Sequence, residues 1–357
     1  MLPIAARSAT VRRLRPVKTS GQEELVAVAE LHQADAVFQG GGVKGIALVG
    51  ALLAFADQGW TEWVSVAGTS AGSIVAGFLG CGYAPADLEK ILRTTPYAEF
   101  EDFGPGGKFV GGGINLVGHH GLAHGEAFHE WFADMIENQT FGDVAKRGKT
   151  LKMIAADITQ KEMLVLPDDL PNYLDPKTKQ PIVIDTFKVA DAVRMSMSIP
   201  FFFQPVEVTH AASGKSSTIV DGGMLSNFPV WLFDVDDRAP ERPTFGFRLY
   251  GGKSMTPGGL HSMMQRVAWP VAFGWDMFGT AMEAWDKRFM SHSTRVRTCP
   301  ISAEGVGTVD FNISDADQTK LLESGERAGQ DFLAGFRLED YFNTYGKKLE
   351  PAPVAVS

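Results

Sequence analysis

The 357-residue sequence has few cysteines, no long apolar run and no excess of positive charge. Its two cysteines, Cys81 and Cys299, have neither the number nor the spacing of a disulfide framework or a zinc site, so a reducing compartment is expected. No stretch approaches the roughly 20 consecutive apolar residues that a membrane-spanning helix needs. The formal net charge of −9 argues against nucleic acid as a partner. These absences favour a cytoplasmic protein that is soluble or lies peripherally at a membrane.

The composition, with 45% hydrophobic and 21% charged residues, is typical of a globular protein. We find no internal repeat and no clear linker, and therefore expect one domain over residues 31–345 and a C-terminal tail at 346–357. Residues 1–30 are expected to form a flexible basic arm. Its cations ahead of the first acid are Arg7, Arg12, Arg13, Arg15 and Lys18. The arm is either a disordered leader with no function or a segment that binds weakly to anionic lipid headgroups.

The order strand, tight turn, helix is predicted twice near the start of this domain. Residues 34–39 are a short extended run, and after a glycine turn residues 43–58 are apolar and helix-like. The order returns with a buried strand at 63–67 and, after a second turn, a helix start at 73–79. Later strand candidates are residues 151–155, 163–166, 217–220 and 245–249. This alternation predicts an α/β fold in which a parallel sheet is covered on both faces.

Residues 68–72, Gly-Thr-Ser-Ala-Gly, match the Gly-x-Ser-x-Gly pattern of a nucleophile elbow. An apolar strand precedes the pattern and a small-residue helix follows it, as an elbow requires. Glycines are needed on both sides because the nucleophile sits on a strained turn, close to neighbouring backbone. Ser70 is therefore the candidate nucleophile, with the amides of a helix N-terminus facing developing negative charge.

The earlier turn, residues 40–45 (Gly-Gly-Gly-Val-Lys-Gly), fits two kinds of site. Its Gly-x-Gly-x-x-Gly spacing is that of a dinucleotide-binding turn in an oxidoreductase, but such a site needs an acid at the end of the next strand. Residues 67–69 there read Ala-Gly-Thr. Consecutive glycine amides can instead approach a substrate carbonyl and stabilise an oxyanion. We interpret the turn as an oxyanion loop in which Gly41, Gly42 and Val43 offer backbone amides.

Asp221 is the candidate base. It follows a β-rich run and precedes Gly222 and Gly223. Its carboxyl is therefore expected at a strand end, beside backbone that carries no side chains. A carboxylate that is partly desolvated and held beside a serine hydroxyl can accept its proton without an imidazole. The alternative is an aspartate that closes a tight turn, as Asp-Gly pairs commonly do.

The three motifs together resemble the patatin-like phospholipases. Sequences of that family carry a glycine-rich turn, then Gly-x-Ser-x-Gly and, much later, Asp-Gly-Gly or Asp-Gly-Ala. Residues 40–45, 68–72 and 221–223 supply these motifs in order. Shorter blocks are also similar: residues 121–125 (Gly-Leu-Ala-His-Gly), 156–159 (Ala-Asp-Ile-Thr), 194–200 (Arg-Met-Ser-Met-Ser-Ile-Pro) and 227–229 (Asn-Phe-Pro). The resemblance spans roughly residues 34–232.

The resemblance implies a three-layer α/β/α sandwich with a mainly parallel central sheet, and a Ser-Asp dyad rather than a triad. It implies a lipid acyl hydrolase of the phospholipase A or lysophospholipase type, without cofactor or metal. Asp221 would deprotonate Ser70, which forms an acyl intermediate, and later the water; Lys44 would orient the glycine turn or meet a substrate phosphate. The alternatives are an acyltransferase or neutral-lipid esterase on the same dyad, and a catalytically silent lipid-binding or storage protein. Some members of the family act only with an activating ligand or protein partner. The sequence does not decide whether this chain needs one.

A cluster of histidines lies between the motifs, at His119, His120, His124 and His129. Interspersed glycines break any helix that would bring His120 and His124 together, and no cysteine or aspartate completes a shell, so zinc is not expected. One of these histidines could instead complete a Ser-His-Asp triad, because sequence order does not fix triad geometry.

Residues 262–289 are rich in methionine and aromatic side chains and are interrupted by Pro270 and two glycines. They form either ordinary core or an acyl-chain pocket and interfacial surface. In the second case Trp269 and Trp275 are candidate substrate-binding residues. The glycine-rich residues 103–113 predict a long surface loop, which is either a lid or a plain connection.

Overall fold

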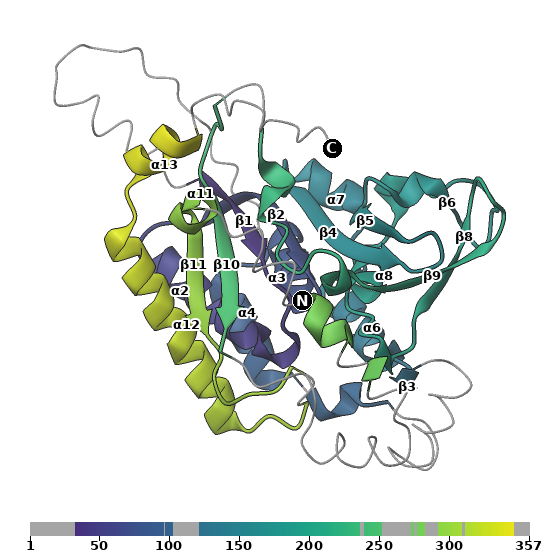
Figure 1. The fold of residues 1–357 in the computed structure, drawn as a ribbon, viewed down its shortest axis with the longest axis horizontal. Helices are drawn as coiled ribbons and strands as arrows, with labels where there is room; N and C mark the ends of the chain where they lie inside the picture. Colours follow the sequence, from purple (N-terminus) through teal and green to yellow (C-terminus); the bar gives the residue numbers. More distant parts are fainter. Residues whose placement is uncertain are drawn as a thin grey trace, which may run out of the picture.

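A computed structural model describes residues 33–95, 97–102, 121–235, 239–251, 273–274, 277–282, 292–308 and 311–345. The expectations for the basic arm, the 103–113 loop, Trp269, Trp275 and the C-terminal tail lie outside these residues and stay predictions. Within the described residues a nine-stranded sheet organises the chain, with helices packed along it (Figure 1).

The sheet is parallel in one half and antiparallel in the other. Its strands follow the order β11 (Thr298–Ser302), β10 (Thr244–Tyr250), β1 (Gln33–Phe38), β2 (Glu62–Thr69), β4 (Thr150–Asp157), β9 (Ser216–Asp221), β8 (Val206–His210) and β6 (Tyr173–Leu174), while β5 (Glu162–Leu166) also pairs with β4. The strands from β11 to β4 run parallel. The others pair antiparallel, because short turns join β4 to β5 and β8 to β9 and a short turn can only reverse the chain. The α/β class is confirmed, with this mixed sheet.

Both predicted strand-turn-helix units are present. The first runs from β1 through a short 3-10 turn, η1 (Gly42–Gly45), into α2 (Ile46–Asp57), and the second runs from β2 directly into α3 (Ala71–Gly80). A smaller sheet pairs β3 (Gly121–Ala123) with β7 (Phe201–Phe203). The later strand candidates correspond to β4, β5, β9 and β10.

Helices cover one face of the main sheet. α2, α12 (Asp315–Gly335) and α4 (Pro85–Thr94) pack together there, and α2 is apolar almost throughout because these neighbours enclose it (Figure 1). Glycines allow α2 and α12 to approach closely, since a β carbon at Gly50 would lie 2.0 Å from the Leu322 carbonyl oxygen. The remaining helices are α6 (Glu126–Met135), α7 (Phe141–Lys146), α8 (Val189–Ser196), α11 (His292–Val296) and α13 (Leu338–Tyr345).

The second face of the central strands carries a smaller apolar cluster. Val37 and Ala67 point to this face and pack against residues 228–233, which include the 3-10 turn η6 (Val230–Phe233). Shorter turns elsewhere are η2 (Tyr97–Phe100), η3 (Leu170–Asn172), η4 (Ile184–Thr186) and η5 (Gly222–Met224). None of the helices in the described part of the chain has the length and apolar character needed to cross a bilayer.

Candidate active site

Strand register brings the candidate nucleophile and base to the same level of the sheet. Thr69, the last residue of β2, pairs with Ile154 of β4, and the next residue of β4, Ala155, pairs with Asp221 at the end of β9. β2 and β9 thus flank β4 on its two sides, and Ser70 and Asp221 lie at the same height along β4. β9 runs antiparallel to β4, so the end of β9 lies beside the middle of β4. Asp221 and Ser70 therefore face each other across β4, although the strands that carry them run in opposite directions.

Ser70 occupies the strained turn that an elbow requires. Its φ of 54° and ψ of −125° are unusual for a residue with a side chain and cost on the order of 1–3 kcal/mol. The side chain is buried, and the amide donates to Ser196 Oγ at 3.1 Å. The Ser73 amide and hydroxyl both donate to the Ser70 carbonyl, at 2.8 and 2.6 Å. Since α3 starts at the next residue, its free N-terminal amides lie beside the nucleophile.

The glycines of the elbow are required by close backbone contacts. A β carbon at Gly68 would lie 2.1 Å from the Gly72 carbonyl oxygen, and one at Gly72 would lie 2.2 Å from the Phe38 carbonyl oxygen. Gly222 has the same role after Asp221, because its β carbon would lie 2.2 Å from the Ile154 carbonyl oxygen. Side chains at these positions would push the nucleophile and the base apart.

Asp221 is completely buried, and burial raises the pKa of its carboxyl to about 7. The Ser70 side chain and the Gly223 amide, which donates to Oδ1 at 2.7 Å, oppose this rise in the pKa. The other carboxyl oxygen, Oδ2, has no partner within hydrogen-bond distance among the described residues. The carboxyl can therefore exchange a proton near neutral pH, and the Ser70 side chain lies close enough to affect its pKa.

The glycine-rich turn lies against the nucleophile, but its amides are not equivalent. A β carbon at Gly40 would lie 3.1 Å from Ser70 Cβ. No described residue accepts a hydrogen bond from the amides of Gly41 or Gly42. Val43 departs from the expectation, because its amide already donates to the Thr308 carbonyl at 3.1 Å. Of the amides of residues 40–43, those of Gly41 and Gly42 are therefore the two without an acceptor among the described residues.

Lys44 belongs to the same turn. It lies half-buried in η1, directly after Val43 and before Gly45. The residue already makes an interaction within the protein, and its assignment to substrate phosphate stays a prediction.

Residues 194–198 hold both members of the pair, a role that sequence analysis did not assign to them. Ser196 Oγ accepts from the Ser70 amide and donates to the Ile154 carbonyl at 2.6 Å, while the Ser198 carbonyl accepts from the Asp221 amide at 2.9 Å. Arg194 anchors the segment, because its buried guanidinium donates to Ser198 Oγ and to backbone carbonyls. Burial lowers the pKa of Arg194 to about 10. The only sequence signal was that these residues form one of the blocks similar to the family.

The described histidines of the cluster make their contacts elsewhere. His124 Nδ1 lies 2.8 Å from Gln204 Nε2, and His129 Nε2 lies 2.7 Å from Asp191 Oδ1. Both line an open groove of about 610 Å³ that contains neither Ser70 nor Asp221. His119 and His120 lie outside the described residues. Within the described part of the chain, no three His, Cys, Asp or Glu side chains are grouped closely enough to hold a metal ion.

Part of the methionine-rich segment reaches the candidate site. A β carbon at Gly223 would lie 2.9 Å from Met282 Cε and 3.0 Å from Asp221 Oδ1. Phe278 and Met282 are buried, whereas Met277 is 58% exposed. Met282 therefore lies beside the Asp221 turn, while Met277 of the same segment faces solvent.

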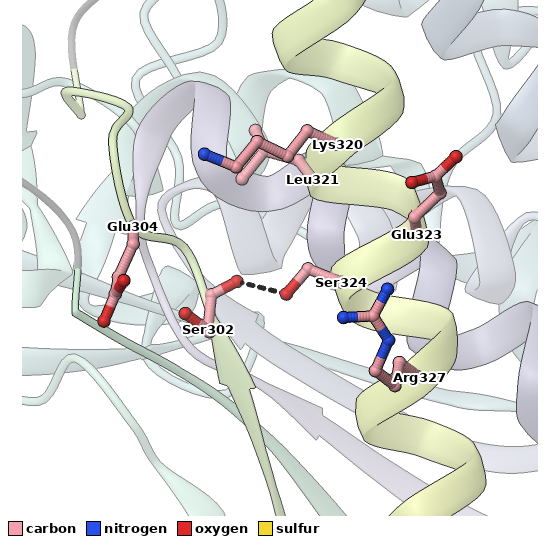
Figure 2. Close-up of a pocket in the computed structure, with 7 residues that line it drawn as sticks. All are labelled: Ser302, Glu304, Lys320, Leu321, Glu323, Ser324 and Arg327. Atoms are coloured by element: carbon pink, nitrogen blue, oxygen red, sulfur yellow. Dashed lines mark hydrogen bonds between the residues drawn. The ribbon is translucent and has the colours of Figure 1, made fainter.

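A second hollow of about 250 Å³ lies between the end of β11 and α12 (Figure 2). Its charged lining is mixed, with Glu304 and Glu323 beside Lys320 and Arg327. The Ser324 hydroxyl donates to the Ser302 carbonyl across its floor at 2.8 Å. It shares no residue with the Ser70 and Asp221 pair, and its balanced charges favour neither an anion nor a cation.

Comparison with known sequences identifies the family to which this geometry belongs. Residues 36–234, more than half of the chain, match the sequence profile of the patatin-like phospholipase family, and this range contains all three motifs. The chain belongs to the patatin-like phospholipase family. Its general activity is therefore that of a lipid acyl hydrolase.

Individual relatives of this patatin-like chain are found in a bacterium and in a virus. The Bacillus subtilis (strain 168) protein YqhO is 34% identical over 307 residues, covering 84% of this chain and 97% of YqhO. The mimivirus protein R571, from Acanthamoeba polyphaga mimivirus, is 27% identical over 213 residues, which cover 58% of this chain and 64% of R571. Among solved structures, VipD from Legionella pneumophila is similar in fold, with a TM-score of 0.50 at 16% identity. The match covers 84% of this chain and 66% of VipD.

Proposed function

We propose that the chain cleaves acyl ester bonds of lipids, as a phospholipase A or lysophospholipase, through a Ser70–Asp221 dyad and an acyl-Ser70 intermediate. The observation that carries the proposal is the pairing of a strained, buried serine with a fully buried carboxyl whose pKa is raised to about 7. A base with a pKa near the working pH is efficient in proton transfer. A purely structural turn aspartate would gain nothing from this burial, which destabilises its charged form.

The chemistry follows from the positions of these groups. Asp221 takes the proton of Ser70 Oγ while the oxygen attacks the ester carbonyl carbon, and the negative charge on the carbonyl oxygen is held by the amides of Gly41 and Gly42. The N-terminus of α3 adds favourable electrostatic potential at the same place. The proton then passes to the leaving alcohol oxygen of the lipid, and the acyl group stays on Ser70. Water completes the cycle in a second attack, with Asp221 again as the base.

The lipid side of the proposal rests on the apolar side chains beside the carboxyl. Met282 borders the Asp221 turn, and methionine adapts to variable apolar shapes such as acyl chains. The lipid would reach these apolar side chains from a membrane or micelle surface. Trp269, Trp275 and the basic arm are expected to bind that surface. Trp269→Ala or Trp275→Ala should then reduce hydrolysis of aggregated lipid more than hydrolysis of a short soluble ester. Equal losses on both substrates with a lower melting temperature would identify the tryptophans as ordinary core.

The direct test is a panel of phospholipids, lysophospholipids, neutral lipids and short esters assayed with wild type and Ser70→Ala. Ser213→Ala, on the exposed turn between β8 and β9, is a matched control. Wild type and the control should release fatty acid, and Ser70→Ala should lose several orders of magnitude in turnover. Adding an alcohol acceptor separates a hydrolase from an acyltransferase, and a requirement for cell extract would reveal an activating partner. Binding of lipid without turnover under all conditions would favour the silent lipid-binding protein.

A further inference from the structure

A second buried oxygen without a partner lies beside the dyad. Asn227 is 6% exposed, and its side-chain oxygen Oδ1, like Asp221 Oδ2, has no hydrogen-bond partner among the described residues. A buried amide oxygen left without a donor destabilises the folded state, so such atoms are rare in folded proteins. Such an atom therefore calls for an explanation, and beside a candidate active site one explanation is a polar group of the substrate or an attacking water.

The position of this oxygen relates it to both members of the dyad. A β carbon at Gly40 would lie 2.2 Å from Asn227 Oδ1 and 3.1 Å from Ser70 Cβ. One at Gly223 would lie 2.9 Å from the same oxygen and 3.0 Å from Asp221 Oδ1. The two glycines thus leave room for the amide, and Oδ1 lies near both the nucleophile and the base.

One side-chain hydrogen bond indicates which end of the amide faces the dyad. The Asn227 carbonyl accepts from the Gly40 amide at 3.0 Å, and its Nδ2 donates to the Gly40 carbonyl at 3.5 Å. Turning the side chain over would place Oδ1 against that carbonyl oxygen, and two acceptors repel. Oδ1 therefore faces the dyad as an acceptor.

We propose that Asn227 is a catalytic residue of the hydrolytic step, in which Oδ1 accepts a hydrogen bond from the attacking water. This rests on the proposed acyl-Ser70 route. The water donates one hydrogen to Asn227 Oδ1 and gives the other, as a proton, to Asp221 Oδ2. Its oxygen bonds to the acyl carbonyl carbon, the bond from that carbon to Ser70 Oγ breaks, and Oγ takes the proton back from Asp221. The products are a free fatty acid and the original dyad.

The same acceptor selects water over other nucleophiles. A water molecule has two hydrogens and satisfies Asn227 and Asp221 together. An alcohol has one O–H, which Asp221 must take, so Asn227 Oδ1 would remain buried without a donor. Asn227 therefore favours hydrolysis over acyl transfer on this dyad.

The test compares Asn227→Leu with wild type and with Gln139→Leu, using a short nitrophenyl ester with and without methanol. Gln139 is a matched control, because its amide also has a buried oxygen without a partner and a long 3.4 Å bond to a carbonyl, that of Cys81 at the opposite end of α3. The rate of the nitrophenolate burst measures acylation, the steady state measures deacylation, and the ratio of methyl ester to free acid measures the choice of nucleophile.

In Asn227→Leu, deacylation by water should fall about tenfold or more, kcat and KM should fall together, and the ratio of methyl ester to acid should rise by a similar factor. Gln139→Leu should change none of these. Equal slowing of acylation and deacylation, with an unchanged ratio of methyl ester to acid, would overturn the inference. Asn227 would then only hold the Gly40 turn in place. If the variant fails to fold, the wild type decides: at equal concentrations its acyl-enzyme must react faster with water than with methanol, and the reverse preference overturns the inference. Absence of any burst or Ser70 adduct in wild type would instead contradict the proposed function.

Discussion

Replacing Asp221 with asparagine is expected to stabilise the protein at neutral to alkaline pH while it abolishes turnover. Asp221 is completely buried, and burial raises the pKa of its carboxyl from 3.8 to about 7. Asparagine keeps the shape of the side chain and an oxygen that can accept from the Gly223 amide, but it never ionises. The variant therefore removes a buried charge without removing the hydrogen bond.

The magnitude follows from proton linkage. Between about pH 4 and pH 7 the folded protein holds a proton on Asp221 that the unfolded chain has released. The folded state binds more protons in this window, so the free energy of unfolding falls as pH rises through it. For a pKa moved from 3.8 to about 7, the fall between pH 5 and pH 8 is about 2–3 kcal/mol.

Urea denaturation of wild type and Asp221→Asn at pH 5 and pH 8 measures this effect. The difference between the two proteins cancels the titration of every other group, and it should move by about 2–3 kcal/mol in favour of the variant at pH 8. In wild type, kcat/KM for a soluble ester should rise through about pH 7 and then level off, because the ionised carboxyl is the base. An identical pH dependence of stability in the two proteins would show that the carboxyl titrates at its ordinary pKa, and the reasoning would fail.

Three further substitutions probe how the site is held. Gly222→Ala places a β carbon 2.2 Å from a carbonyl oxygen of β4, so thermal melting should show a loss of about 1–3 kcal/mol and kcat should fall as Asp221 moves. Ser196→Ala removes the acceptor of the Ser70 amide and should lower kcat more than it changes KM for a soluble ester; an unchanged kcat would deny Ser196 its positioning role. His124→Gln and His129→Gln should retain most activity, because both rings are bonded outside the dyad, and a loss as large as that of the nucleophile variant would favour a triad.

Local pattern was sufficient to predict the elements that carry the nucleophile. The alternation of apolar strand, glycine turn and helix depends on neighbours in sequence, and the structure has it at β1 to α2 and at β2 to α3. The glycines at 68 and 72 were expected on steric grounds, and the contacts that a β carbon would make there are the reason. The α/β class follows from the same pattern.

Contacts between distant segments could not be predicted in this way. The antiparallel register of β9 on β4 sets the height of Asp221, and no periodicity within either strand encodes that pairing. The Val43 amide was expected to be open, but a carbonyl from Thr308, far along the chain, accepts its hydrogen bond. Asn227 shows the same limit, because its burial and its unpartnered oxygen arise only when the Gly40 turn and the Asp221 turn meet.

The central claim is that the acyl group of the substrate passes through Ser70 with Asp221 as base. The most direct measurement is acid quenching of the reaction during the burst, followed by digestion and mass spectrometry of wild type, Ser70→Ala and Asp221→Asn. The account predicts an acyl adduct on the peptide that contains Ser70 in wild type, and none in Ser70→Ala or Asp221→Asn. An adduct on another residue, or turnover that survives in Ser70→Ala, would contradict it.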